Sequence, residues 1–337
     1  MAASEKTFRE RYMAGETDFD EIFDLTEKWG FSDETCTLRE YLGLTEQEED
    51  IWVTTSDEDL EDFMEKEKTR WVFFTDLDGT LLDDDKNISD ENRAEIERIL
   101  ADGHAVVLCT GRALPSAIQQ AKRLGLLGRS CYLICYNGAQ IYDAERRCLI
   151  YKTGIPLTTV RKVFDDAHNH GINVQTYSEQ GVLAEKDSSS LQKYLVLQSL
   201  TAKIVPDVCK TLKEDPPKIL ALDFDSHDNV ESFREYMTQA YDGELDCYLS
   251  NPYYLEIVPL GINKGNAVRF LCGHLGIPIS RSLAAGDAEN DLSMILAAGT
   301  GAVMANGEPL LKENADYITT ADNNHSGVSE ILRKFIP

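Results

Sequence analysis

Short apolar runs alternate with amphipathic stretches along most of the chain. Residues 71–74 are apolar at every position, which is typical of a strand buried on both faces of a parallel sheet. A helical pattern follows at residues 90–101, and a second apolar run occupies residues 105–109. Because this order repeats, it predicts an α/β fold with a doubly wound parallel sheet and helices on both faces.

Residues 154–255 interrupt this alternation. They mix helical patterns with short apolar strands, and Pro216 and Pro217 stop any helix that would cross them. This stretch therefore predicts an inserted α+β domain. The strand–helix order resumes afterwards, so we expect one core domain to be built from residues 71–153 and 256–337.

The first 70 residues follow a different pattern. Apolar side chains recur there at spacings of three and four, which is typical of short amphipathic helices and not of disorder. The same segment holds 22 acidic and 8 basic residues, which is more than half of the net charge of the chain. Residues 1–70 thus predict a small helical extension, with a module for a partner protein or for self-association as the alternative.

The composition is that of a globular protein, with 42% hydrophobic and 27% charged residues among 337. An apolar run of roughly 18 residues would be needed to span a membrane, and the sequence has none. The polar amino terminus does not resemble a signal peptide. Eight scattered cysteines without paired spacing indicate reduced thiols, so we expect a cytoplasmic protein.

The formal net charge of −26 argues against nucleic acids and anionic membranes as partners, since both are bound by clustered Lys and Arg. Distant surface acids are screened beyond about 8 Å at physiological ionic strength. An anionic substrate is therefore compatible with this charge, provided that cations and backbone N–H groups line its site.

The most informative residues follow the first predicted strand. Asp76 and Asp78 stand one residue apart at its end, and Gly79 and Thr80 come next. Open α/β sheets bind ligands at the carboxyl ends of their strands. Gly79 permits a sharp turn that brings backbone N–H groups close to an anion. The segment indicates a place where a metal and a phosphate meet, with an acidic turn of no function as the alternative.

Three later segments also fall at predicted strand ends or helix starts: Thr-Gly-Arg at 110–112, Asn-Lys-Gly at 263–265, and Gly-Asp-Ala-Glu-Asn-Asp at 286–291. Together with Asp-Leu-Asp-Gly-Thr at 76–80, and in this order, they resemble the four motifs of the haloacid dehalogenase superfamily. The resemblance is to its Cof-type phosphatases, which carry a large cap between the second and third motifs. It covers residues 71–337 and implies a Rossmann-like core with an inserted cap.

Hydrolysis of phosphate monoesters in water is extremely slow, which favours a covalent route. We predict that Asp76 is the nucleophile and forms an aspartyl-phosphate, while Asp78 acts as general acid and then as general base. Their spacing in an extended chain places both carboxylates on the same side. The resemblance implies the same assignment.

A magnesium site is expected beside these residues. Asp287 should complete it with Asp76 and the backbone carbonyl of Asp78, while Asp291 steadies the metal's waters or Lys264. Hard oxygen ligands are those that Mg²⁺ prefers. The metal and Lys264 would offset the repulsion between Asp76 and a phosphate dianion.

Other motif residues are predicted to contact the phosphate. Thr110 and the N–H groups that follow it, from Gly111 on, should hold a transferring phosphoryl oxygen, as the second motif of the family does. Arg112 contacts the substrate or forms a structural ion pair. Asn290 should lie in or next to the site, and Asn137 should line its mouth.

The resemblance implies a Mg²⁺-dependent phosphatase that acts on a small phosphorylated metabolite, with sugar phosphates ahead of pyridoxal phosphate, flavin mononucleotide and nucleotides. A phosphomutase and a non-catalytic binding or scaffold protein are the alternatives. Residues that set specificity are expected within 154–255, where Lys218 is either structural or substrate-facing.

Overall fold

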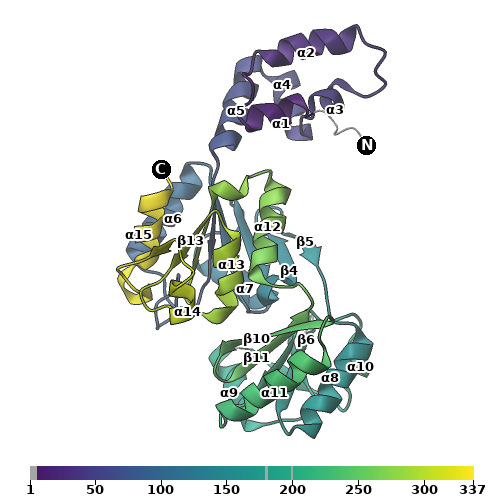
Figure 1. Cartoon of the computed structure of the whole chain (residues 1–337), viewed down its shortest axis with the longest axis vertical. Coiled ribbons are helices and arrows are strands. Elements are labelled where there is room, and N and C mark those ends of the chain that lie inside the picture. Colours follow the sequence, from purple (N-terminus) through teal and green to yellow (C-terminus); the bar gives the residue numbers. More distant parts are fainter. Residues whose placement is uncertain (1–5, 179–180, 199) are drawn as a thin grey trace. The chain divides into compact units, whose positions relative to one another are not determined.

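The structure is a computed structural model that describes residues 6–178, 181–198 and 200–337. The chain forms two compact units, one up to Arg70 and one from Trp71 onward (Figure 1). The second unit contains two sheets, one of the core and one of the insert, which we call the cap. The predicted α/β fold with an inserted α+β domain and preceding helices is confirmed.

The amino-terminal unit is helical, as the spacing of its apolar residues predicts. Its described helices are α1 (Phe8–Met13), α2 (Glu21–Gly30), α3 (Leu38–Leu42), α4 (Glu46–Thr54) and α5 (Asp57–Thr69). Threonines at positions 7, 37 and 45 begin α1, α3 and α4 in capping boxes with a glutamate three residues later. The apolar faces meet in one buried cluster of Phe8, Tyr12, Phe19, Ile22, Leu42, Leu44, Leu60 and Met64.

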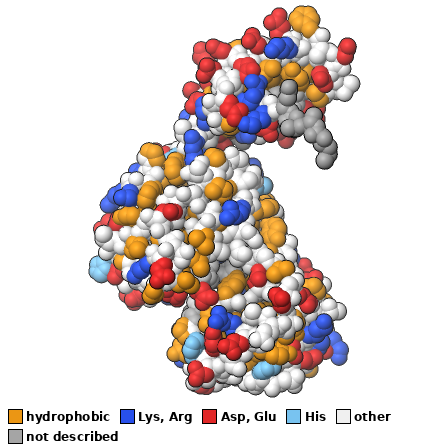
Figure 2. Space-filling view, in the orientation of Figure 1, with side chains coloured by type: hydrophobic (Ala, Val, Ile, Leu, Met, Phe, Trp, Pro, Cys, Tyr) orange, Lys and Arg blue, Asp and Glu red, His pale blue; other side chains and the backbone are white. Residues whose placement is uncertain are grey.

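Charge on this unit lies mostly outside that cluster. Figure 2 shows acidic side chains spread over its visible face, with basic side chains among them. Among the described residues of this unit, Glu48 is the exception, because it is fully buried and accepts hydrogen bonds from Arg9 Nε at 2.8 and 2.9 Å. The pair joins α1 to α4, so it contributes to the packing of the helices as well as to charge balance.

The core sheet has eight strands in the order β14-β13-β12-β1-β2-β3-β4-β5. Neighbours from β14 to β3 are parallel, while β3, β4 and β5 are antiparallel. The turn Tyr136–Gly138 is too short for a crossover, so β4 must return beside β3. The strands are β1 (Val72–Thr75), β2 (Ala105–Cys109), β3 (Cys131–Cys135), β4 (Gln140–Asp143), β5 (Cys148–Lys152), β12 (Ser282–Gly286), β13 (Thr300–Val303) and β14 (Tyr317–Ile318).

Helices cover both faces of this sheet, as expected for a doubly wound fold (Figure 1). Phe73 of β1 packs in the cluster with α6 (Asp90–Ala101), α7 (Leu114–Arg123) and α15 (Gly327–Phe335). Phe74 points the other way and packs with α12 (Lys264–Leu275), α13 (Leu292–Ala297) and α14 (Pro309–Lys312). Both rings are fully buried, which stabilises the fold by about 1.5–3 kcal/mol for each ring.

The cap is a six-stranded sheet in the order β10-β11-β9-β6-β7-β8, with α8 and α11 on one face (Figure 1). Its strands are β6 (Asn173–Ser178), β7 (Gly181–Ala184), β8 (Ala202–Ile204), β9 (Ile219–Leu222), β10 (Leu245–Asn251) and β11 (Tyr254–Pro259). Its helices are α8 (Leu157–Asn169), α9 (Ser189–Gln198), α10 (Val208–Thr211) and α11 (His227–Ala240).

Strand β11 pairs with both β9 and β10, so the cap sheet extends beyond the predicted boundary at residue 255. The run at residues 254–258, which is apolar except for Glu256, would suit a strand of either sheet, and only its pairing decides between them. In the part of the chain that the structure describes, no helix is both long enough and apolar enough to cross a membrane.

Candidate active site

Three neighbouring strands bring the motif residues to one edge of the core sheet. Thr75, the last residue of β1, is paired with Leu108 of β2 and Ala285 of β12. Asp76, Thr110 and Asp287 therefore follow the carboxyl ends of adjacent parallel strands. The N–H of Asp76 donates to the carbonyl of Ala285 at 3.0 Å, which holds the chain in register just beyond β1.

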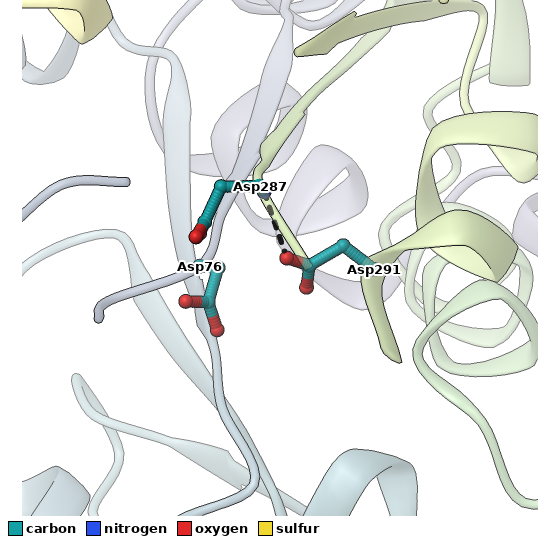
Figure 3. Close-up of side chains that lie close together, drawn as sticks. All are labelled: Asp76, Asp287 and Asp291. Carbon is teal, nitrogen blue, oxygen red and sulfur yellow. Dashed lines mark hydrogen bonds between the residues drawn. The ribbon is translucent and has the colours of Figure 1, made fainter. Parts of the chain in front are cut away.

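Three carboxylates converge there. One oxygen from each of Asp76, Asp287 and Asp291 lies within 4.8 Å of the others. Figure 3 shows the three side chains close together, with Asp76 after β1 and with Asp287 and Asp291 in the segment between β12 and α13. Asp291 Oδ2 accepts from the N–H groups of Asp287 at 3.0 Å and Ala288 at 3.2 Å, so it orders the loop after β12. Such a cluster is the arrangement expected of a site for a hard cation.

Lys264 ties two of these carboxylates together. Its side chain is fully buried, and Nζ donates to Asp76 Oδ1 at 2.6 Å and to Asp291 Oδ1 at 2.5 Å. Burial disfavours the charge, but the carboxylates of Asp291 and Asp76 outweigh it and raise the pKa of Lys264. Gly265, the next residue, lets the start of α12 lie close to α13. A Cβ at position 265 would lie 2.2 Å from the carbonyl oxygen of Ser293 in α13.

The site still holds more negative than positive charge. Burial raises the pKa of Asp76 well above its usual range, although the Lys264 ammonium acts in the opposite direction. Burial and the nearby Asp291 raise the pKa of Asp287 to about 7, despite a hydrogen bond from Thr80 Oγ1 at 2.6 Å. A divalent cation would relieve this repulsion, so the donor set fits Mg²⁺.

The hydrogen bonds indicate which oxygens a cation would use. Both oxygens of Asp291 are engaged, Oδ1 by Lys264 and Oδ2 by backbone N–H groups. Asp76 and Asp287 each use Oδ1 for the bonds given above. We therefore expect their Oδ2 atoms to ligate the cation, while Asp291 positions Lys264 and the loop.

The affinity for Mg²⁺ is expected to rise with pH as Asp287, whose pKa is raised to about 7, loses its proton. A protonated Asp287 must lose its proton before it can bind a cation, so affinity should increase up to about tenfold per pH unit below a pKa of about 7. Calorimetric titrations in buffers of different ionisation enthalpy measure both the affinity and the released proton. An affinity that is constant across this range would exclude Asp287 as a titrating ligand.

Asp78 is paired with two cations. Arg112 donates to both of its oxygens, from Nε at 2.7 Å and from Nη2 at 2.6 Å. Lys86 Nζ lies 2.9 Å from Asp78 Oδ1. Burial alone would raise the pKa of Asp78, but Arg112 and Lys86 outweigh burial and hold it below the usual range.

Of the two alternatives for Arg112, the structure contains the ion pair. Lys86 is a neighbour that the sequence analysis missed. It has a left-handed backbone (φ 63°) in the turn after Asp83, and its N–H donates to the carbonyl of Asp83. The run of aspartates before it signals a turn, but nothing in the sequence directs this lysine toward Asp78.

The predicted phosphate-binding residues lie around the same edge. Thr110 is buried, and its hydroxyl accepts a hydrogen bond from the N–H of Arg112 at 3.1 Å. The N–H of Asn137 donates to the carbonyl of Thr110 at 3.1 Å, and Asn290 Nδ2 lies 3.4 Å from Asn137 Oδ1. A Cβ on Gly111 would come within 3.1 Å of the Asn137 side chain.

Gly79 occupies a position that other residues do not fit. Its φ is +85°, and a Cβ would lie 2.4 Å from Asp287 Oδ2. Any side chain at position 79 would displace the carboxylate of Asp287, which we expect to ligate a cation.

The cap reaches this edge through Lys218, which precedes β9. Lys218 is almost fully buried, and its Nζ donates to the carbonyl of Gly111 at 2.7 Å. The same Nζ lies 2.6 Å from Glu256 Oε2 in β11. The cap thus contacts the loop that carries Thr110 and Arg112.

Comparison with known proteins gives the following matches. A family model of haloacid dehalogenase-like hydrolases matches residues 73–332. A Streptococcus pyogenes protein named as a candidate phosphatase is 32% identical over 270 residues, which cover 77% of this chain and 96% of that protein. The 5-amino-6-(5-phospho-D-ribitylamino)uracil phosphatase YitU of Bacillus subtilis is 29% identical over 278 residues, covering 79% of this chain and 97% of that protein.

Solved structures share the fold. The crystal structure of a haloacid dehalogenase-like hydrolase from Bacteroides thetaiotaomicron superimposes with a TM-score of 0.72 at 28% sequence identity. The match covers 79% of this chain and 99% of the other. The family match leaves residues 1–72 outside it.

Proposed function

The chain belongs to the haloacid dehalogenase-like hydrolases, in their Cof-type phosphatase branch, and we propose that it hydrolyses its phosphate monoester through an aspartyl-phosphate on Asp76. The enzyme is a phosphoric monoester hydrolase that acts on small phosphorylated metabolites. The observation that carries the proposal is the placement of Asp76 at the end of β1, bonded to Lys264 and beside Asp287.

In the first half-reaction, a carboxylate oxygen of Asp76 attacks phosphorus and the bond to the ester oxygen breaks. Asp78 donates a proton to the departing alkoxide, which leaves as the alcohol. In the second half-reaction, water attacks the phosphorus of the aspartyl-phosphate and gives its proton to Asp78. Inorganic phosphate leaves, and both aspartates return to their initial states.

Asp78 must change partners during this cycle. Arg112 and Lys86 stabilise its carboxylate form, which suits the base of the second step but not the acid of the first. A phosphate dianion is a strong competitor for a guanidinium group. Substrate binding that draws Arg112 toward the phosphate would release Asp78 and favour its protonation.

Asp76 and Asp287, with the backbone carbonyl of Asp78, would hold Mg²⁺, whose positive charge screens the phosphate from Asp76 when the ion is bound. Lys264 keeps Asp76 oriented and supplies a second positive charge. The N–H groups after Thr110 and the hydroxyl of Thr110 would donate to phosphoryl oxygens, with Asn137 and Asn290 beside them.

We further infer a sugar or polyol phosphate as the substrate. The Bacillus subtilis relative is named for an ester that carries its phosphate on a ribityl group. A phosphomutase would use the same aspartyl-phosphate but return the phosphoryl group to a hydroxyl of the sugar. The two activities differ in whether inorganic phosphate is released.

The proposal predicts Mg²⁺-dependent release of phosphate from p-nitrophenyl phosphate and from a panel of sugar and polyol phosphates. Removing the metal with EDTA should abolish the activity, because the buried carboxylates would then repel the substrate, and added Mg²⁺ should restore it. The physiological substrate should exceed the others in kcat/KM by more than about tenfold. A chain that isomerises sugar phosphates without releasing phosphate would instead be a mutase.

A further inference from the structure

One face of the cap sheet carries a row of polar side chains on three of four neighbouring strands, of which Gln175 and Glu256 are buried and Tyr248 is half-buried. Tyr248 of β10 pairs with Glu256 of β11, which pairs with Leu220 of β9, which in turn pairs with Gln175 of β6. Directly paired residues point to the same face, and neighbouring strands lie about 4.8 Å apart, so the row is about 14 Å long. It is therefore comparable in length to a small metabolite.

Polar atoms of this row lack hydrogen-bond partners among the residues that the structure describes. They are both amide atoms of Gln175, which is 1% exposed and lies beside the side chain of Tyr177 without completing a hydrogen bond, and the hydroxyl of Tyr248. The amide nitrogen of Asn137, in the core, also lacks a hydrogen-bond partner among these residues. Buried polar groups in native proteins nearly always have partners, so a group of unpartnered atoms in one region points to a ligand.

The row faces the proposed catalytic loops. Tyr248 lies beside the side chain of Asn137, although the two do not complete a hydrogen bond. Asn137 is in contact with Asn290 of the fourth motif, and Lys218 reaches the carbonyl of Gly111 in the second. The polar row and the phosphate-binding residues are thus parts of one region.

A cavity of 440 Å³ lies between the cap and the core, and Gln175, Tyr248 and Asn137 are not among its lining residues. Tyr177 is two residues beyond Gln175 in β6 and lies over the core residue Tyr136, with ring centroids 5.3 Å apart. Both tyrosines line the cavity, which also extends to cap residues near Pro216. Its size suits a small metabolite.

The charged side chains beside the row are paired. Lys218 is paired with Glu256, and Arg112 is paired with Asp78. The groups left to bind a ligand are therefore two amide donors, an amide acceptor and a hydroxyl. This set suits neutral hydroxyl, carbonyl or amide groups, whereas a second phosphate or a carboxylate would need a cation of its own.

We propose that Gln175 and Tyr248 of the cap, together with Asn137, bind the leaving group of the substrate and that this leaving group is uncharged and rich in hydroxyl or amide groups. The inference rests on the proposed phosphatase function and deepens it. It assigns specificity to residues that hydrogen-bond the substrate and do not take part in phosphoryl transfer.

Gln175→Leu and Tyr248→Phe in the full chain test the assignment, because each removes polar atoms with little change of shape. We expect each variant to lose about tenfold or more in kcat/KM for the best sugar or polyol phosphate. The kcat/KM for p-nitrophenyl phosphate should change by less than about threefold, since its leaving group lacks hydroxyl groups to bind. The melting temperature should stay the same or rise, because the deleted atoms have no partner to lose.

Tyr241→Phe is the matched control. Its hydroxyl donates to Asp166 at 2.7 Å in the helical layer on the other face of the cap sheet. This variant should lower the melting temperature and leave the ratio of the two kcat/KM values unchanged. A structural role for Gln175 and Tyr248 would give the same result as this control and would overturn the assignment.

The substrate panel tests the chemical class. A hexose monophosphate should be preferred over the matching bisphosphate by about tenfold or more, and equal or reversed preference would overturn the uncharged leaving group. A wild-type chain that hydrolyses none of these esters would overturn the proposed function itself. A different result would overturn only the role of the polar row. In that case the wild-type chain hydrolyses p-nitrophenyl phosphate, and Gln175→Leu and Tyr248→Phe keep the substrate preference of the wild type.

Discussion

Asp76→Asn is expected to reduce phosphatase activity by at least about 10⁴-fold. An amide at this position cannot act as the nucleophile, and no covalent intermediate can form. The protein should remain folded, because Lys264 keeps its bond to Asp291 at 2.5 Å and one of three mutually repelling carboxylates is removed. Steady-state rates with p-nitrophenyl phosphate and a melting curve for the same sample measure both effects.

Asp85→Asn is a suitable control, since Asp85 is an exposed aspartate nine residues further along the same segment. It should retain the wild-type rate within about twofold, because exposed charges of this kind have small effects. An Asp76→Asn variant with more than about a hundredth of the wild-type rate would show that another group attacks the phosphorus.

Lys264→Met is expected to damage both stability and activity. The change leaves buried carboxylates without their cation, which typically costs about 3–5 kcal/mol of unfolding free energy when one partner of a buried pair is removed. Activity should fall by about 10²-fold or more, because Asp76 loses both its orientation and a nearby positive charge. Denaturant unfolding and steady-state kinetics measure the two losses.

The double variant Lys264→Met with Asp291→Asn separates these effects. Removing one charge of each sign should recover part of the lost stability, while the activity stays low. Lys312→Met is the control for loss of a lysine, because among the described residues Lys312 bonds a carbonyl, that of Ala305 at 2.6 Å, and no carboxylate. A Lys264→Met variant as stable as wild type would show that the buried charges are compensated elsewhere.

The strand ends of the core could be predicted from the sequence because the apolar runs before them are short and fully buried. Once residues 71–74 and 105–109 are read as neighbouring parallel strands, Asp76 and Thr110 must lie at one edge. Lys264 could be predicted from a different signal, namely a charged residue at an electrostatically unfavourable position. A cation at a helix start is unfavourable, and the structure offsets it with Asp76 and Asp291.

Side-chain contacts beyond those between the four motifs could not be predicted. The sequence left Arg112 undecided between substrate and ion pair, and it did not indicate Lys86, because both bonds to Asp78 depend on turns and side-chain conformations. The polar row of the cap depends on the strand order β10-β11-β9-β6, in which residues 175 and 256 become near neighbours. The spacing of residues along the chain does not indicate this strand order.

The covalent mechanism is tested most directly by acid-quenched mass spectrometry of an Asp78→Asn variant after mixing with Mg²⁺ and p-nitrophenyl phosphate. Its leaving group departs without a general acid, whereas hydrolysis of the aspartyl-phosphate needs the base that the variant lacks. We predict a burst of p-nitrophenol and a phosphoryl group on Asp76 that approaches one per chain. Turnover without a burst, and with no phosphoryl group on Asp76, would contradict the covalent mechanism.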